Sequence, residues 1–305
     1  MIRSAYACFV RGFSIGRVFY FAAALALTFG AAPSDAQSSA PHFHVASTSK
    51  IGGEGSWDYL EYEEATDRLF IARVGGVLVV DAHDMRAVGT VPAFAGTRVH
   101  GIALASDLGV GMTSDGHDET ATVFDLATLK ALRRVPLNHA PDAILYDSVS
   151  QKGVAFDGDD NVAVAFDPKT GKVFAEVKLP GSPEAAVSDG DGHVYVNLSD
   201  KNEIAAIDTR TWAVDQHWVI GGACEDPTPL ALDRTSHRLF SGCRSGVLAV
   251  VDPTKKQLVE TLPIGKGADS VAYDPGSGLI FVACYDGTLT VAKGVSPSHY
   301  EVVDT

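Results

Sequence analysis

An internal repeat of about 42 residues constrains the fold of this chain more than any other feature. Strand-like segments end with spacings of 42, 43, 40, 45 and 41 residues, at Phe70, Met112, Ala155, Tyr195, Phe240 and Phe281. Apolar runs that close on aspartate recur with spacings of 44, 42, 41 and 44 residues, at Asp81, Asp125, Asp167, Asp208 and Asp252. Because two independent markers keep the same period, we expect one structural unit to be repeated six times.

Each unit contains four short strand-like segments separated by polar turns, and no segment keeps a helical period. In the fourth unit the predicted strands are Glu184–Val187, His193–Leu198, Glu203–Asp208 and Trp212–Ile220. Four strands in about 42 residues are typical of one blade of a β-propeller. Wholly apolar runs such as Val77–Val80 and Leu248–Val251 suit a sheet that is packed on both faces. The sequence therefore predicts an all-β fold, a propeller of four-stranded blades with six blades present.

The aspartates that close the third strands have a structural interpretation. In Asp167-Pro168-Lys169-Thr170-Gly171, the carboxylate can accept hydrogen bonds from backbone two residues further on, and Pro and Gly suit turn geometry. We expect these aspartates to begin the turn into each fourth strand, because a residue repeated in every blade usually serves every blade.

The fourth unit carries a family resemblance. Val194-Tyr195-Val196-Asn197, followed by Ile204–Thr209 (IAAIDT), resembles the YVTN repeat of exported YncE-like bacterial propellers, within the WD40-like and quinoprotein-like superfamily. That resemblance implies a seven-bladed ring, and it implies no agreed set of catalytic residues. The segment His44–Gly53 looks like the fourth strand of a further blade, comparable with Leu258–Gly267. We therefore expect an incomplete seven-bladed ring that lacks its last blade. A visible gap or a poorly packed seam should lie between the first and last units, with this N-terminal strand loosely attached or lying along it.

Residues 1–36 are predicted to be a secretory signal peptide that precedes a propeller over 37–305. Three arginines come before the apolar run Val18–Ala32, and Ser34 and Ala36 provide small residues before a cleavage point. An uncleaved anchor is the alternative, although the run is short for a bilayer span. Both interpretations export the propeller, and cleavage leaves it periplasmic or secreted, without a membrane span.

The net charge of the chain bears on which partners it can bind, and its cysteines bear on the compartment in which it folds. The chain carries a net charge of −14, and without the three Arg and one Asp of residues 1–36 it carries −16. A field of this sign repels phosphate backbones, so nucleic acid is not a predicted partner. Of the cysteines after Cys8, Cys224 and Cys243 are predicted to form a disulfide and Cys284 to stay unpaired. A metal or redox role for the pair lacks CxxC spacing.

One end of the propeller is predicted to bind a ligand. The resemblance implies that ligands meet the face where the first strands begin, and aligning the units places Asp58, His100, Asp142, Glu184 and Asp269 there. Clustered carboxylates favour positively charged partners, namely a protein, a peptide or a small cationic ligand. The alternative is that these acids are hairpin-turn residues on a solvated rim. Between the two kinds of function, we predict a binding protein rather than an enzyme.

An enzyme remains the alternative. It would be a lactonase-like hydrolase or lyase in which His100 acts as a general base beside Glu184 and Asp142. No cofactor or metal ligand set is predicted, although a divalent cation remains open. The run Asp157-Gly158-Asp159-Asp160-Asn161 lacks the sixth-position Gly and twelfth-position Glu of a calcium loop, so it is interpreted as a hairpin turn.

Overall fold

The computed structural model describes residues 43–52, 55–93 and 98–305. These residues belong to one compact unit, Ala40–Thr305. The predicted signal peptide, residues 1–36, lies outside the described residues.

The described residues form six antiparallel four-stranded sheets, numbered here as blades 1 to 6 in chain order. Blades 1 to 3 consist of β1 (Trp57–Glu63), β2 (Arg68–Arg73), β3 (Gly76–Asp81), β4 (Ala87–Pro92); β5 (Ile102–Ala105), β6 (Val110–Asp115), β7 (Thr120–Asp125), β8 (Ala131–Pro136); β9 (Ala143–Asp147), β10 (Lys152–Asp157), β11 (Val162–Phe166) and β12 (Val173–Lys178). Blades 4 to 6 consist of β13 (Pro183–Ser188), β14 (His193–Leu198), β15 (Glu203–Asp208), β16 (Ala213–Val219); β17 (Pro227–Asp233), β18 (Arg238–Cys243), β19 (Val247–Asp252), β20 (Gln257–Pro263); β21 (Ala268–Asp274), β22 (Leu279–Cys284), β23 (Leu289–Ser296) and β24 (His299–Asp304).

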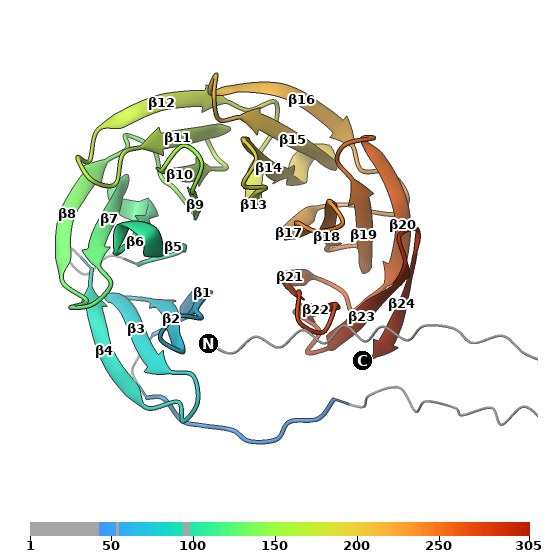
Figure 1. Ribbon diagram of the computed structural model, residues 1–305, viewed down its shortest axis with the longest axis horizontal. Helices are drawn as coiled ribbons and strands as arrows, with labels where there is room; N and C mark the ends of the chain where they lie inside the picture. Colours follow the sequence, from blue (N-terminus) through green and yellow to red (C-terminus); the bar gives the residue numbers. More distant parts are fainter. Residues whose placement is uncertain (1–42, 53–54, 94–97) are drawn as a thin grey trace, which may run out of the picture. The chain divides into compact units, whose positions relative to one another are not determined.

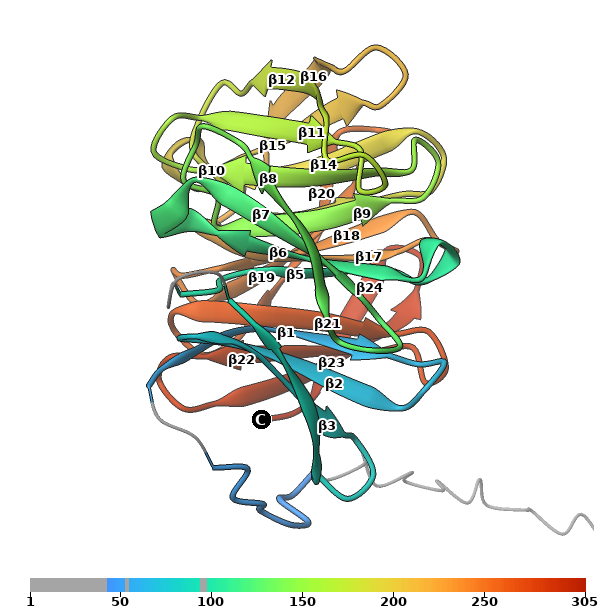
Figure 2. The same cartoon turned by 90° about the vertical axis from the view of Figure 1, so that its left-hand side faces the viewer.

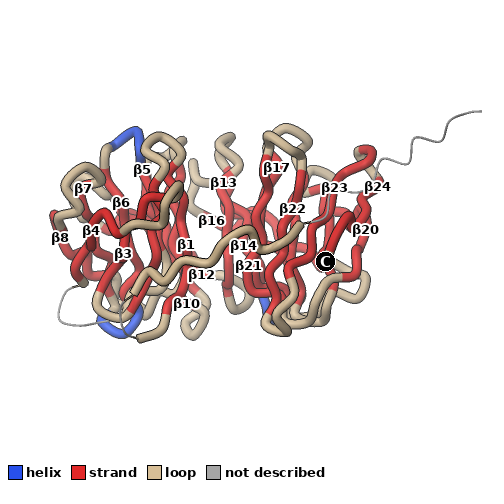
Figure 3. Tube along the Cα trace, turned by 90° about the horizontal axis from the view of Figure 1, so that it is seen from below, coloured by secondary structure: helices blue, strands red, loops and turns tan. Residues whose placement is uncertain are grey.

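The blades are arranged around a common axis as a β-propeller, which confirms the predicted fold class. Figure 1 shows the first strand of each blade nearest the axis and the fourth strand at the outside; β8, an outer strand, faces the viewer in Figure 2. Helix within the described residues is limited to the three-residue turns Ser106–Leu108, Gly116–Asp118 and Ser199–Lys201, and strands dominate the trace in Figure 3.

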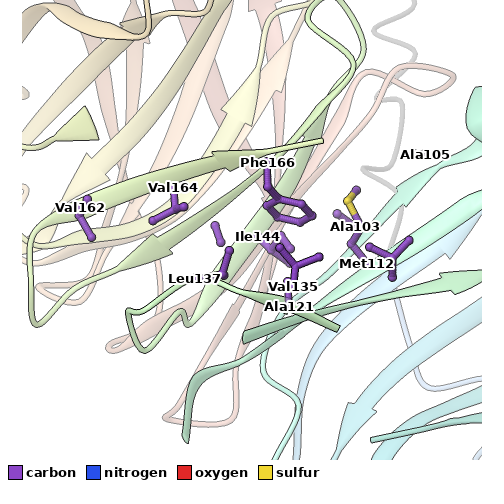
Figure 4. Close-up of a cluster of buried hydrophobic side chains, with 12 residues drawn as sticks. Ala103, Ala105, Met112, Ala121, Val135, Leu137, Ile144, Val162, Val164 and Phe166 are labelled. Carbon is purple, nitrogen blue, oxygen red and sulfur yellow. The ribbon is translucent and has the colours of Figure 1, made fainter. Parts of the chain in front are cut away.

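Buried apolar clusters join each blade to the next. Figure 4 shows the cluster between blades 2 and 3, in which Met112 of β6 and Phe166 of β11 are fully buried. Comparable clusters join blades 1 and 2, 3 and 4, 4 and 5, and 5 and 6. A single blade cannot bury both of its faces alone, so the propeller is the unit that folds.

Two glycines explain how large rings fit inside the blades. Gly111 pairs across the sheet with Phe124, and Gly153 pairs with Phe166. A Cβ atom at either glycine would overlap the partner's ring. The missing side chain on β6 and β10 is therefore what allows a phenylalanine of the neighbouring strand to lie flat against the sheet.

The strand-closing aspartates hold turns, as predicted. Oδ1 of Asp81 accepts hydrogen bonds from the backbone of His83 and Asp84, and Oδ1 of Asp167 does the same for Lys169 and Thr170. The equivalent carboxylates of blades 2, 4 and 5 accept backbone N–H groups from the same turn, at Asp125, Asp208 and Asp252. These residues serve the fold and are not available for chemistry.

The predicted disulfide is present. Cys224 and Cys243 are bonded, with their Cα atoms 5.2 Å apart, and Cys284 is buried as a free thiol. A disulfide of this kind indicates an oxidising, extracytoplasmic compartment. Within the described residues, no helix is long and apolar enough to cross a membrane.

The prediction that residues 44–53 form a strand is wrong. Residues 44–52 form no strand, because no neighbouring strand of the described residues pairs with them. The segment instead runs between the last and first blades. The backbone N–H of Phe43 donates to Asp304 at 2.5 Å, the ring of Phe43 meets that of Phe281 edge-on, and the carbonyl of Gly52 accepts a hydrogen bond from Arg73.

The seam between blades 6 and 1 is packed less well than the other junctions, as predicted. No buried apolar cluster joins these two blades within the part of the chain that the structure describes. Leu60 and Tyr62 alternate with residues that face blade 2, and both are 52% exposed, while Leu289 on the far face of blade 6 is 48% exposed. Residues 43–52 therefore lie along a seam that retains exposed apolar side chains.

Candidate functional site: the axial cavity

A cavity of about 1030 Å³ lies between the first strands of all six blades. Its size is at the upper end of the range for small-molecule sites. We call the end at which the first strands begin the mouth. Each blade places one residue there from the same position of the repeat: Asp58, His100, Asp142, Glu184, Thr228 and Asp269.

The structure brings the first three of these residues into direct contact. Nδ1 of His100 lies 3.0 Å from Oδ2 of Asp58 and 2.9 Å from Oδ1 of Asp142. The hydrogen bonds to Asp142 and then to Asp58 raise the pKa of His100 to about 9. Asp58 also accepts a hydrogen bond from Arg98 at 2.8 Å. We call Asp58, His100 and Asp142 the triad; blades 1, 2 and 3 supply one member each.

Glu184 and Asp269 lie apart from the triad. Burial, and then the charge of Asp142, raise the pKa of Glu184, which hydrogen bonds to Ser199. The described residues show no contact between Glu184 and His100, so of the two carboxylates predicted to accompany His100, only Asp142 contacts it. Asp269 is exposed at the mouth, on the blade 6 side.

Four carboxylates act together on one tyrosine. Tyr59 of β1 lines the cavity, and burial raises the pKa of its hydroxyl far above the ordinary value. The charges of Asp142, Glu184, Asp58 and Asp269 raise it further. Carboxylates from blades 1, 3, 4 and 6 therefore all act on one place inside the mouth.

Sequence reasoning missed several residues of the cavity. Glu61 follows Tyr59 by two residues on β1 and also lines the cavity. Burial raises the pKa of its carboxyl group to about 7. Arg98, Arg234 and Arg244 bring positive charge to the lining, and Trp57 and Tyr285 bring exposed aromatic rings. Glu61 had a signal in the repeat, because the equivalent positions of the other five first strands are apolar: Ala103, Leu145, Val187, Ala231 and Ala272.

The acidic run that follows β10 is a turn. Asp157 is buried and its carboxylate accepts three backbone hydrogen bonds, from Ala140, Asp159 and Asp160. His139 lies 2.6 Å from Asp160. The carboxylate of Asp157 is thus already used by the backbone, which supports the interpretation of this run as a hairpin turn.

In comparisons with known proteins, no family model and no curated protein matches the chain. The YncE-like resemblance therefore stays a prediction.

Proposed function

We propose that this chain is an exported binding protein, periplasmic or secreted, that holds a small organic cation in its axial cavity. The observation that carries the proposal is that four blades each place a carboxylate in the lining of one cavity, namely Asp58, Asp142, Glu184 and Asp269. Because Asp58 and Asp142 already contact His100, and Asp58 also contacts Arg98, a positively charged ligand would interact mainly with Glu184 and Asp269.

The lining supplies the other parts of a small-molecule site. Trp57 lines the mouth with an exposed ring, and aromatic faces attract cationic groups. The ring of Tyr285 already has the guanidinium of Arg244 over it, 5.7 Å from the ring centre. Apolar strand residues such as Ile102 and Leu230 line the cavity as well. A cavity with apolar and aromatic walls and a few charged groups is the usual form of a site for a small molecule.

The enzyme alternative receives less support from the same geometry. General-base catalysis requires His100 to accept a proton, yet two carboxylates face its Nδ1 and raise its pKa to about 9. At neutral pH most of the imidazole is already protonated. Binding needs no such proton transfer, and the acidic mouth supports it directly.

Isothermal titration calorimetry with choline and 1,4-diaminobutane tests the proposal. The protein is first treated with chelator and dialysed, so that divalent ions do not compete, and sodium butyrate serves as the anionic control ligand. We expect at least one of the two cations to bind and butyrate not to bind. Glu184→Gln and Asp269→Asn should each weaken binding about fivefold to tenfold, which corresponds to about 1 kcal/mol.

Glu64→Gln provides the matched control, because Glu64 is exposed on the β1–β2 turn and does not line the cavity. This variant should bind the cations as tightly as the parent. Binding of neither cation, or an equal loss of affinity in Glu184→Gln and Glu64→Gln, would show that the mouth carboxylates do not hold a cation.

A further inference from the structure

Two carboxylate oxygens of the triad, from Asp58 and Asp142, both approach the same ring nitrogen, Nδ1 of His100, at 3.0 and 2.9 Å. An imidazolium carries one hydrogen on this nitrogen, and a strong hydrogen bond is nearly linear. The Nδ1–H group can therefore point well at only one of the two oxygens. Oδ2 of Asp58 also accepts a hydrogen bond from Arg98 at 2.8 Å, yet a single proton on Nδ1 does not account for the close approach of both oxygens to it.

A metal ion satisfies the same arrangement. The nitrogen and the two carboxylate oxygens all lie within 4.8 Å of one another. Two ligands at right angles around an ion, each about 2.1 Å from it, are about 3.0 Å apart. The two separations from Nδ1 match this value, so one ion can lie between Nδ1 and the two carboxylate oxygens.

We propose that Asp58, His100 and Asp142 bind one divalent transition-metal ion, with Mn²⁺ and Zn²⁺ as the best candidates. One imidazole with two carboxylates suits these ions, whereas Mg²⁺ and Ca²⁺ prefer oxygen ligands alone. The ion replaces the imidazole proton and leaves its remaining positions open toward the cavity. This site goes beyond the binding of an organic cation and does not depend on it.

The surroundings support an ion at this place. Arg98 donates to Oδ2 of Asp58 at 2.8 Å, the same oxygen that faces Nδ1, and this hydrogen bond fixes the position of that oxygen. The opposite edge of the His100 ring packs near Gly116, where an added Cβ would lie 3.5 Å from the ring. Nδ1 is thus held toward the two carboxylates.

Mn²⁺ titration followed by electron paramagnetic resonance tests the inference, because free and bound Mn²⁺ differ in signal. The protein is treated with chelator, dialysed, and titrated without any organic cation. We expect about one bound ion per chain and competition by Zn²⁺. His100→Gln and Asp142→Asn should each weaken Mn²⁺ binding at least about tenfold, with circular dichroism confirming that both variants are folded.

His139→Gln is the matched control, because His139 belongs to the other group of the described residues that could hold an ion, with Asp157 and Asp160. It should leave Mn²⁺ binding unchanged. Absence of binding by the parent protein would overturn the inference, as would binding lost in His139→Gln and kept in His100→Gln. Neither result tests the binding of the organic cation, which is measured separately by calorimetry with Glu184→Gln and Asp269→Asn.

Discussion

The carboxyl group of Glu61 is a sensitive probe of the cavity. Burial raises its pKa from 4.5 to about 7, and the described residues give it no ion pair. Below pH 4.5 the group is protonated in both the folded and the unfolded chain. As the pH rises from 4.5 to 7, the unfolded chain loses this proton first, so the group reduces the stability of the folded state, and the full penalty is present above pH 7.

Replacing Glu61 by glutamine should remove this penalty while keeping nearly the same shape. The shift corresponds to about 3 kcal/mol if taken in full. Because part of the side chain still faces the cavity, we expect the variant to be more stable than the parent by about 2 kcal/mol at pH 8. The advantage should shrink steadily as the pH is lowered toward 5.

Urea unfolding of the parent and of Glu61→Gln, followed by tryptophan fluorescence from pH 5 to 8.5, measures this difference. Glu64→Gln is the control, since this glutamate is exposed on the adjacent turn, and its stability relative to the parent should not change with pH. If Glu61→Gln shows no advantage at pH 8, or the same advantage at every pH, then Glu61 does not sit in a desolvated part of the cavity.

Three further changes test the fold. Replacing both Cys224 and Cys243 by serine opens a loop with a sequence separation of 19 and should lower the free energy of unfolding by about 3 kcal/mol. Gly111→Ala places a methyl group against the ring of Phe124 and should cost about 2 kcal/mol. Phe43→Ala removes the ring contact that fastens residues 43–52 to blade 6 and should cost about 1 kcal/mol. Urea unfolding at pH 7.5 measures all three.

Each of these changes has its own control. Reduction of the parent protein should reproduce the loss seen in the double serine variant, and an unchanged midpoint after reduction would contradict the first prediction. Gly109→Ala tests whether Gly111 is special, because a Cβ at Gly109 meets nothing within 4 Å, although its positive φ of 68° adds a cost of its own. A Gly111→Ala loss no larger than that of Gly109→Ala would contradict the second. Val45→Ala changes an exposed residue of the segment next to Phe43, and an equal loss in both variants would contradict the third.

Much of the fold could be predicted from the sequence because the repeat fixes it locally. The second and third strands of blade 4 have the predicted bounds, His193–Leu198 and Glu203–Asp208. These strands are central in the blade and lie between sharp turns, so the local pattern determines where they begin and end. The segment 44–52 has a strand-like pattern too, but a strand also needs a partner to hydrogen bond with, and local pattern carries no information about that.

The candidate site was predictable only in part, for a related reason. Alignment of the units placed Asp58, His100 and Asp142 at one end, since equivalent positions of the blades lie at the same height along the axis. That alignment did not show which carboxylates contact His100, because the contact depends on side-chain reach across neighbouring blades. Arg98 was missed entirely, as it lies in a connection between blades and has no equivalent in the repeat.

The repeat also separates structural from functional residues without any relatives to compare. The position that closes the third strand is aspartate in five blades because each carboxylate holds a turn, so its identity is fixed by the backbone. The residue at the mouth position does not hold a turn in this way, and it varies among aspartate, histidine, glutamate and threonine from blade to blade. A binding site for one asymmetric ligand requires such variation, because the ligand contacts each blade with a different part of its surface. The mouth position can vary in this way because its side chain holds no backbone turn. The mouth should therefore tolerate substitution without loss of folding, and its variants should change binding first.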